Sequence, residues 1–254
     1  MKPGWLALGP DGPGAVQMEI DRRMAAATAW DGRTRIRLYR FLPPAVSLGY
    51  HQREGDIDRA ACRGRGFDIV RRPTGGRAVL HKGDLVYSIT VAEKGLEEDA
   101  PLHRGVYNLV SLALVQGLRR LGVQADPAAD PALLAAPKGD LPRLCFSSAT
   151  RHEVQVRGKK LVGSAQRRLR GVVLQHGSIL AGEDHLEIVD VLSGVTSERR
   201  GALRDALHKR TICLHEAGYR GSLEEIREIL AEAFEEVFAP LERRETESLD
   251  GLVV

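Results

Sequence analysis

The sequence predicts a mixed α/β domain in which helices flank one mixed sheet. Two patterns carry this prediction: short runs with period-two alternation recur along the chain, and other segments carry the apolar stripe of an amphipathic helix. In addition, no internal repeat and no obvious interdomain linker interrupts the 254 residues. We therefore expect a single domain over residues 1–254, with a C-terminal helical segment over residues 222–241 packed on it.

The N-terminal part is predicted to form a helix and then short strands. Residues 14–30 have a helix-favouring composition, and residues 35–41 alternate until Pro43-Pro44 ends the run. A short strand follows in VSLGYHQ, residues 46–52. Residues 56–64 have the character of a short helix that ends at Gly64 or Gly66.

Residues 67–91, FDIVRRPTGGRAVLHKGDLVYSITV, place three arginines and a glycine pair between two predicted strands, residues 67–70 and 85–91. A tight turn is the plain explanation for Gly75-Gly76. Glycines also let backbone N–H groups approach a ligand, and successive N–H groups can form an anion-binding nest. The flanking Arg72, Arg77 and His81 favour a loop that holds a ligand.

The second half is predicted to contain two amphipathic helices and three strands. An apolar stripe that includes Val106, Val110 and Leu114 predicts a helix over residues 103–121. Residues 152–182 indicate strand, turn, strand, turn, strand, with turns at residues 157–158 and 170–171. Residues 222–241 form the second helix, which begins at a capping box of Ser222 and Glu225.

Residues 125–143, between the helix predicted over residues 103–121 and the three strands, hold four prolines and little periodicity, so we expect a long loop there.

Composition excludes several classes of protein. The net charge of +3, from 37 basic and 34 acidic residues, is too balanced for a nucleic-acid-binding face, although arginines at 71–77 and 167–170 could steer an acidic partner. No apolar run reaches the ~20 residues of a membrane span, and the N-terminus lacks the apolar core of a signal peptide. Three cysteines without paired spacing argue against disulfides or a zinc site, so we expect a cytoplasmic protein.

Cys145 and Lys160 stand out among the reactive side chains. We interpret Cys62 and Cys213 as small buried residues, whereas Cys145 follows the long loop, where it is accessible. Lys160 begins a buried strand-like run, which is costly unless the lysine is paired or acts on a ligand. Its ammonium would favour the thiolate form of Cys145. His176 either has its hydrogen bonds satisfied within the sheet or lines a pocket.

Two long motifs carry a resemblance to a known family. RRPTGGRAVLH (71–81) and GKKLVGSAQRR…GVVLQHGSIL (158–180) resemble the biotin/lipoate protein ligase superfamily, in particular its lipoate-attachment branch. Ligases of this branch activate lipoate with ATP, usually have Gly-Gly-Gly in the first motif and lack a cysteine before the lysine strand. This chain has Arg77 at the third position and Cys145-Phe146 before that strand, which is similar to octanoyltransferases of the LipM type.

This resemblance implies a fold of the biotin/lipoate ligase type and assigns roles to residues. Cys145 would be the nucleophile that carries the acyl group as a thioester, and Lys160 the pocket lysine that holds the acyl carbonyl. One departure is Arg151-His152, where relatives often carry Ser-Tyr or Trp-Tyr. The implied substrate-binding residues are Arg72, Thr74, Gly75, Gly76, Arg77, His81, Gly163, Ser164, Ala165, His176 and Gly177.

The resemblance also implies the reaction and its partners. The enzyme would be an acyltransferase that moves octanoate from octanoyl-acyl carrier protein to a lysine of a lipoyl domain of 2-oxoacid dehydrogenases or of the glycine-cleavage H protein. We expect no ATP, no metal, no nucleic acid and no membrane. Alternatives are an ATP-dependent lipoate–protein ligase, an amidotransferase that moves lipoyl or octanoyl groups between proteins, and a catalytically silent lipoyl- or biotin-binding regulator.

Overall fold

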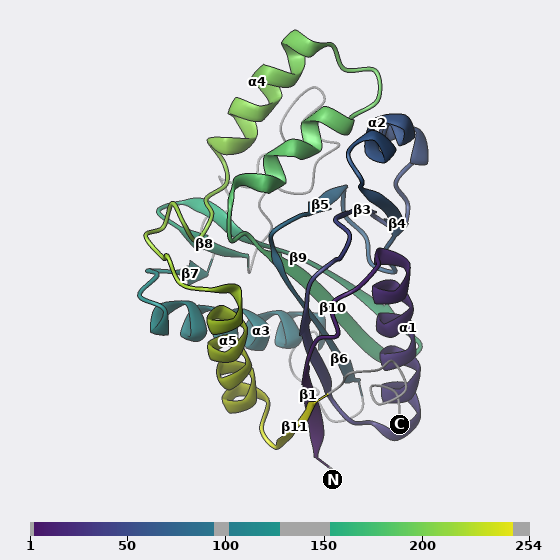
Figure 1. The fold of residues 1–254 in the computed structure, drawn as a ribbon. Helices are drawn as coiled ribbons and strands as arrows, with labels where there is room; N and C mark the ends of the chain where they lie inside the picture. Colours follow the sequence, from purple (N-terminus) through teal and green to yellow (C-terminus); the bar gives the residue numbers. More distant parts are fainter. Residues whose placement is uncertain (1–2, 94–101, 128–152, 246–254) are drawn as a thin grey trace.

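The computed structural model describes residues 3–93, 102–127 and 153–245, which form two sheets and the helices that cover them (Figure 1). The large sheet has the strand order β11-β1-β2-β6-β10-β9-β8-β7, and the small sheet has the order β4-β3-β5. The predicted mixed α/β fold is confirmed. The strands of the large sheet are β1 (Gly4–Leu8), β2 (Arg35–Tyr39), β6 (Leu85–Ala92), β7 (Asp126–Pro127), β8 (Val154–Val156), β9 (Lys159–Leu169), β10 (Val172–Ile179) and β11 (Leu241–Glu245).

The remaining elements are the small sheet and the helices. The small sheet consists of β3 (Ala45–Leu48), β4 (Asp68–Arg71) and β5 (Val79–His81). The helices are α1 (Gly14–Asp31), α2 (Arg59–Gly64), α3 (Leu102–Arg120), α4 (Ser197–His208) and α5 (Leu223–Phe238), with 3-10 helices η1 (Glu54–Asp56) and η5 (Glu183–Val191). None of the helices within the described residues combines the length and apolar character that crossing a membrane requires.

The centre of the large sheet is the antiparallel set β6-β10-β9-β8. Its two predicted turns are confirmed. Arg157 and Gly158 have φ of 51° and 72°, and Arg170 and Gly171 have φ of 46° and 83°. Two consecutive positive φ values are what a two-residue type I′ hairpin requires, so these turns set the register of β8, β9 and β10.

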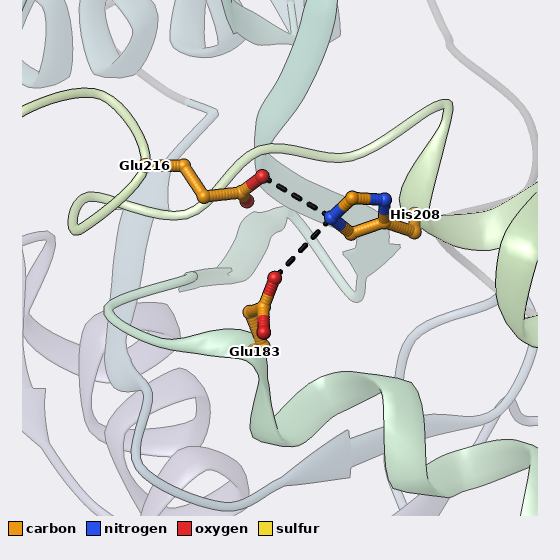
Figure 2. Close-up of side chains that lie close together, drawn as sticks. All are labelled: Glu183, His208 and Glu216. Atoms are coloured by element: carbon orange, nitrogen blue, oxygen red, sulfur yellow. Dashed lines mark ion pairs between the residues drawn. The ribbon is translucent and has the colours of Figure 1, made fainter.

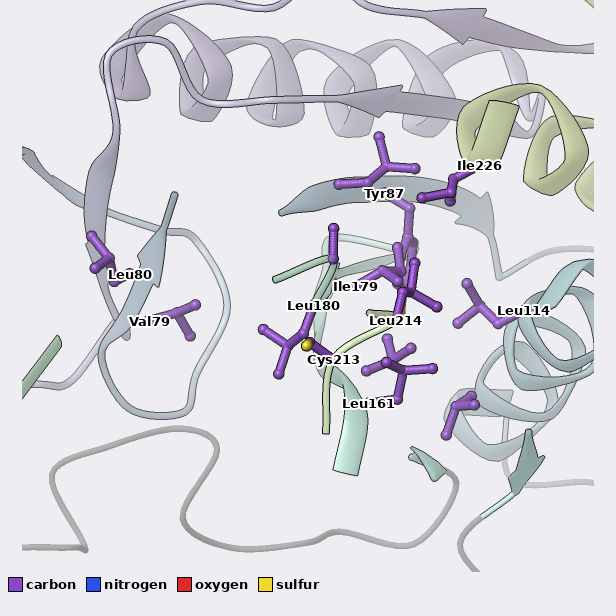
Figure 3. Close-up of a cluster of buried hydrophobic side chains, with 14 of the residues drawn as sticks. Val79, Leu80, Tyr87, Leu114, Leu161, Ile179, Leu180, Cys213, Leu214 and Ile226 are labelled. Atoms are coloured by element: carbon purple, nitrogen blue, oxygen red, sulfur yellow. The ribbon is translucent and has the colours of Figure 1, made fainter. Parts of the chain in front are cut away.

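Alternation along β1 explains why helices cover both faces of the large sheet. Trp5 and Ala7 pack with Ile20 and Met24 of α1, while Leu6 points into the main core on the opposite face. That core also contains residues of α3 and α5, which lie side by side in Figure 1. Figure 3 shows part of this core, including Leu161 and Ile179 of the sheet, Leu114 of α3 and Ile226 of α5.

The chain differs from the predicted elements at several places: helix α4 was not predicted, and both edge strands of the large sheet, β11 and β7, lie outside the predicted strands. The helix predicted over residues 222–241 begins as expected, since the Ser222 hydroxyl accepts a hydrogen bond from Glu225 N at 3.0 Å. It ends at Phe238, however, and Leu241 begins β11, which pairs in parallel with β1. Residues 126–127, predicted as loop, form β7 against β8. Both strands are short and poor in β-branched residues, so their own sequences do not favour a strand. Their extended conformation depends on pairing with β1 and β8.

A buried histidine in η5 predicts acid sensitivity. His185 is buried, and its Nε2 lies 2.9 Å from Thr211 Oγ1. Burial lowers the pKa of His185 from 6.5 to about 4. In the unfolded chain His185 therefore binds a proton below pH ~6.5, whereas in the folded chain it binds one only below about pH 4. The free energy of unfolding consequently falls as the pH falls from about 6.5 to about 4.

We expect the wild type to lose about 3 kcal/mol more than His185→Gln between pH 7 and pH 4, measured by urea unfolding. The matched control is His51→Gln, which removes an exposed imidazole and should follow the wild type. Parallel pH curves for the wild type and His185→Gln would contradict the prediction.

Candidate functional site

A cavity of about 360 Å³, part of it open to solvent, lies where the small sheet meets α1 and the large sheet. Its walls are mostly apolar, and backbone of β9 and β10 forms one side. Seven of the fourteen lining residues carry a polar group, but most of the surface that faces the cavity is apolar, which is typical of a pocket for an apolar ligand with one reactive end. The lining consists of Met18, Tyr39, Phe41, Ser47, Arg72, Val79, His81, Val86, Gly163, Ser164, Ala165, His176, Gly177 and Ser178.

The structure gathers most of the predicted substrate-binding residues around this cavity. Those in the lining are Arg72, His81, Gly163, Ser164, Ala165, His176 and Gly177. The other four, Thr74, Gly75, Gly76 and Arg77, lie in the adjoining loop and are not part of the lining. Cys145 and His152 lie outside the described residues.

Gly177 is required by the packing behind this wall. A Cβ at Gly177 would lie 2.5 Å from Cε1 of Tyr87 on β6. The Tyr87 hydroxyl is in turn 2.7 Å from Ser164 Oγ and accepts from Gln175 Nε2 at 3.0 Å. The Tyr87 ring therefore lies against a glycine, and its hydrogen bonds hold β6, β9 and β10 in register beside the cavity.

Arg72 stabilises the Pro73–Arg77 loop, which contains Gly75 and Gly76. Its Nη2 donates to Gly75 O at 2.8 Å and Arg77 O at 2.7 Å, and its Nη1 donates to Ser47 O at 2.8 Å. The loop also packs closely on β3, because a Cβ at Gly49 would lie 1.9 Å from Gly76 O. The guanidinium therefore serves as a buried strut that shapes the cavity wall.

The neighbouring arginines are also engaged inside the molecule. Arg71 Nη1 donates to Gly49 O at 2.9 Å and to Gln52 O at 2.7 Å. Arg167 Nη1 donates to Pro73 O at 2.8 Å, and its guanidinium lies 3.7 Å from the Tyr50 ring centroid. Arg167 therefore holds the Pro73–Arg77 loop against β9, and Arg71 holds the segment that follows β3. The sequence indicated these arginines as a steering patch, but both make contacts inside the molecule.

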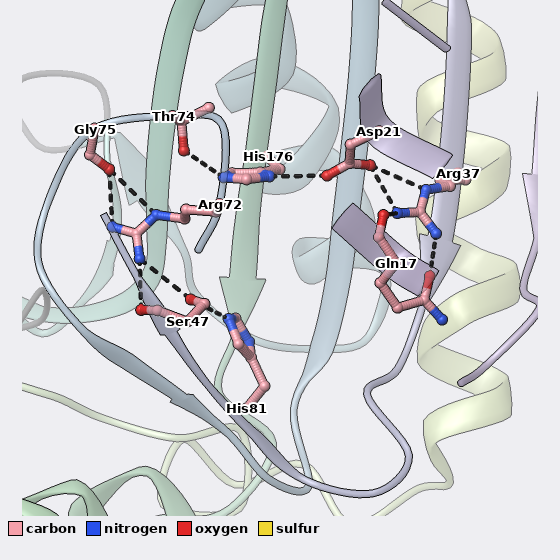
Figure 4. Close-up of polar contacts among 9 residues, drawn as sticks. All are labelled: Gln17, Asp21, Arg37, Ser47, Arg72, Thr74, Gly75, His81 and His176. Atoms are coloured by element: carbon pink, nitrogen blue, oxygen red, sulfur yellow. Dashed lines mark hydrogen bonds and ion pairs between the residues drawn. The ribbon is translucent and has the colours of Figure 1, made fainter. Parts of the chain in front are cut away.

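Two chains of hydroxyl, imidazole and carboxylate cross this region. Figure 4 shows the first chain and the Ser47–His81 part of the second. In the first, Thr74 Oγ1 is hydrogen bonded to His176 Nε2, and His176 Nδ1 lies 3.1 Å from Asp21 Oδ2. Asp21 also accepts from Arg37 Nη2 at 2.7 Å, and both residues are fully buried. His176 thus lines the cavity, and both of its ring nitrogens have partners, but these partners lie in a loop and in α1 rather than within the sheet.

Charge balance in the first chain follows from burial and pairing. Burial alone would raise the pKa of Asp21, but the Arg37 charge and the His176 hydrogen bond outweigh it and lower the pKa from 3.8 to about 2. Burial also lowers the pKa of His176, which favours the neutral imidazole. With Asp21 accepting from Nδ1–H, Nε2 accepts from the Thr74 hydroxyl.

In the second chain, His81 Nε2 lies 2.9 Å from Ser47 Oγ, and His81 Nδ1 lies 2.8 Å from Asp84 Oδ2. Ser178 Oγ donates to the same Asp84 oxygen. Phe41 stacks on the His81 ring with centroids 4.3 Å apart, which fixes the plane of the imidazole. Ser47, His81 and Ser178 line the cavity, and Asp84 lies behind them, buried.

Lys160 is paired rather than free. It is 3% exposed, and its Nζ lies 2.6 Å from Oε1 of Glu153, which is 2% exposed. The sequence predicted that a lysine at this position needs a partner or a ligand, and the structure supplies a partner. Lys160 is not among the residues that line the cavity.

The interpretation of Cys62 and Cys213 as buried residues is confirmed, and burial raises the pKa of the Cys62 thiol to about 11.

Sequence analysis missed Ser47, Asp84, Asp21 and Glu153, which partner the predicted residues. Each is a common polar residue in an unremarkable segment. Asp84 carried the clearest signal, because HKGD places a carboxylate three residues after His81. Glu153 had a weaker one, as an acid at the start of the strand that pairs with the lysine strand.

A second group of titratable side chains lies away from the cavity (Figure 2). His208 Nε2 is 3.2 Å from Glu183 Oε1 and 3.3 Å from Glu216 Oε1. These ligand atoms lie within 4.8 Å of one another, a donor set that a divalent metal ion can use. The charge of Lys159 acts on Glu216, however, which disfavours a cation there. We interpret the group as ion pairs that tie α4 to η5 and to the segment before α5.

Comparison with known proteins places this geometry in context. Residues 13–235 match the family described as Lipoyl protein ligase A/B catalytic domain. A protein of Kyrpidia tusciae named Octanoyltransferase LipM is 41% identical over 232 residues, which cover 89% of this chain and 83% of that protein. A protein of the same name from Carboxydothermus hydrogenoformans is 33% identical over 228 residues, covering 89% and 82%.

Solved structures share the fold. A bipartite lipoate protein ligase from Thermoplasma acidophilum superimposes with a TM-score of 0.74 at 24% identity, covering 100% of this chain and 91% of that one. A lipoate-protein ligase A bound with ATP gives a TM-score of 0.72 at 24% identity, covering 99% and 92%.

Proposed function

The chain belongs to the lipoyl protein ligase A/B catalytic domain family and is an acyltransferase, and from this we propose that it transfers octanoate from octanoyl-acyl carrier protein to a lysine of a lipoyl domain or of the H protein. The observation that carries the proposal is the cavity between the two sheets. An apolar slot with a few convergent polar groups is what an eight-carbon acyl chain requires. Burial of the six methylenes and the terminal methyl contributes at most about 6 kcal/mol to chain binding.

The proposed chemistry passes through an acyl-enzyme. The Cys145 thiolate attacks the carbonyl carbon of the octanoyl thioester, and the carrier thiol leaves with the electron pair of the broken C–S bond. Lys160 stabilises the thiolate and the oxyanion of the tetrahedral intermediate. The amine of the acceptor lysine then attacks the Cys145 thioester, and Cys145 leaves.

This reaction requires neither ATP nor a metal ion. The donor is already a thioester, so exchange onto another thiol is close to thermoneutral, and formation of the amide is downhill. Support for this part of the proposal comes from the identity to proteins named as octanoyltransferases, and from Arg77 and Cys145, where ATP-dependent ligases have a third glycine and no cysteine.

Intact-protein mass spectrometry tests the proposal. After mixing with octanoyl-acyl carrier protein and no ATP, the protein should gain one octanoyl group that hydroxylamine removes. Cys145→Ala should abolish the adduct, and Cys62→Ala, a matched control at a buried cysteine, should retain it. The ligase alternative predicts the opposite: no adduct without ATP, and modification of an acceptor domain once ATP and free lipoate or octanoate are supplied.

A further inference from the structure

The hydrogen bonds around His81 run in one direction. Asp84 is acceptor-only as a carboxylate, so Ser178 Oγ–H and His81 Nδ1–H both donate to it. His81 Nε2 is then an acceptor and takes the Ser47 hydroxyl proton at 2.9 Å. Arg72 Nη1 completes the chain by donating to Ser47 Oγ at 3.2 Å. The assignment of each proton follows from the partners and leaves a lone pair of His81 directed at a cavity-lining hydroxyl.

The chain of Thr74, His176 and Asp21 differs in two ways from the chain of Ser47, His81 and Asp84. Asp21 is neutralised by Arg37, whereas the contacts of Asp84 in the described part of the chain are His81 and Ser178, neither of them a permanent cation. Thr74 lies outside the cavity lining, whereas Ser47 lies in it. A carboxylate without an arginine supports the positive charge that an imidazole gains when it accepts a proton. His176 is therefore a structural strut, and His81 is equipped to take a proton.

The acceptor amine must lose a proton during amide formation, and the described site offers few groups to take it. The Lys160 ammonium, which the proposed function assigns to the oxyanion, already carries its proton and is paired with Glu153 at 2.6 Å. Ser47, His81 and Asp84 have the arrangement in which a hydroxyl, an imidazole base and an orienting carboxylate lie within hydrogen-bond distance.

We propose that His81 accepts the proton of the attacking lysine amine through Ser47, an inference that rests on the proposed function. The amine nitrogen forms the C–N bond to the acyl carbon, and its proton passes to Ser47 Oγ as the Ser47 proton passes to His81 Nε2. The C–S bond to Cys145 then breaks, and the imidazolium returns the proton to the leaving thiolate. Asp84 is a positioning residue that holds His81 in the tautomer that this transfer needs.

Single-turnover kinetics of the isolated octanoyl-enzyme test this step. In His81→Gln, transfer to the acceptor lysine should fall about 100-fold, the lower end of what a general base contributes. Cleavage of the same thioester by hydroxylamine, a small and weakly basic nucleophile that can pass its proton to water, should stay within about threefold of the wild-type rate. A purely structural role for His81 would slow both nucleophiles alike.

Two variants guard against misfolding and non-specific effects. His81→Asn retains a donor toward Asp84 and should show the same split between lysine and hydroxylamine, and His208→Gln, far from the cavity, should transfer at the wild-type rate. Lysine transfer at wild-type rates in both His81 variants, or equal loss with both nucleophiles, would overturn the inference while the proposed function stands. Absence of an octanoyl-enzyme in the wild type would instead overturn the proposed function, and this inference with it.

Discussion

Replacement of Lys160 by methionine is expected to lower octanoyl transfer about 10³-fold and to cost about 3–5 kcal/mol of folding stability. The activity should fall because the proposed mechanism assigns this ammonium to the Cys145 thiolate and the developing oxyanion. The stability falls because the Glu153 carboxylate, 2% exposed, loses the cation 2.6 Å away. Transfer to an acceptor domain and denaturant unfolding measure the two effects separately.

A second substitution separates the roles of this ion pair. In Lys160→Met/Glu153→Gln, no uncompensated charge remains in this pair, so most of the lost stability should return while transfer stays low. The matched control is Lys159→Met on the adjacent, half-buried lysine, which should retain both properties. Recovery of transfer in the double variant would show that Lys160 serves folding alone.

Replacement of Arg37 by methionine is expected to destabilise the protein by about 3–5 kcal/mol. Arg37 and Asp21 are both 0% exposed and form an ion pair of 2.7 Å between α1 and β2. Removal of the guanidinium leaves the Asp21 carboxylate buried without its cation, and also removes the hydrogen bond to Gln17 O. Urea unfolding at pH 7 measures the loss.

The double variant Arg37→Met/Asp21→Asn should recover much of this loss, because the amide oxygen still accepts from His176 and no charge is left unpaired in this pair. Arg22→Met breaks an exposed pair with Glu19 on the same helix and should change stability by no more than about 0.5 kcal/mol. A loss in Arg37→Met as small as that of Arg22→Met would contradict the assigned role of the buried pair.

The same pair predicts a second acid transition. Because the folded pKa of Asp21 is lowered from 3.8 to about 2, its contribution is fully present above about pH 5 and is lost as pH falls toward 2. The contribution is about 2 kcal/mol, and Arg37→Met should lack it.

The sequence predicted those turns and helices that have a clear local pattern of glycines or apolar residues. The turns at residues 157–158 and 170–171 carry glycine at a position of positive φ, and α3 and α5 carry apolar stripes. The turns and α3 were placed correctly, and α5 was predicted with its correct start but three residues too long. Strand β11 was missed because LERRE has no strand pattern, and its pairing with β1 arises only when α5 brings it there. Helix α4 is largely polar and was missed for a related reason, because its few buried side chains do not form a long stripe.

For the candidate site, too, some features follow from local sequence and others from packing. The two long motifs were enough to predict seven of the residues that line the cavity, because each motif carries its own pattern of residues. The hydrogen-bond partners of these side chains became known only from the folded chain. Hydrogen bonds that fix a protonation state, such as His81 to Asp84 and Ser47, or Lys160 to Glu153, join residues whose distance in space depends on the whole fold. Burial, the other factor that sets charge, is likewise a property of packing, so the same histidine or lysine can be a strut or a reactive group until its neighbours are known.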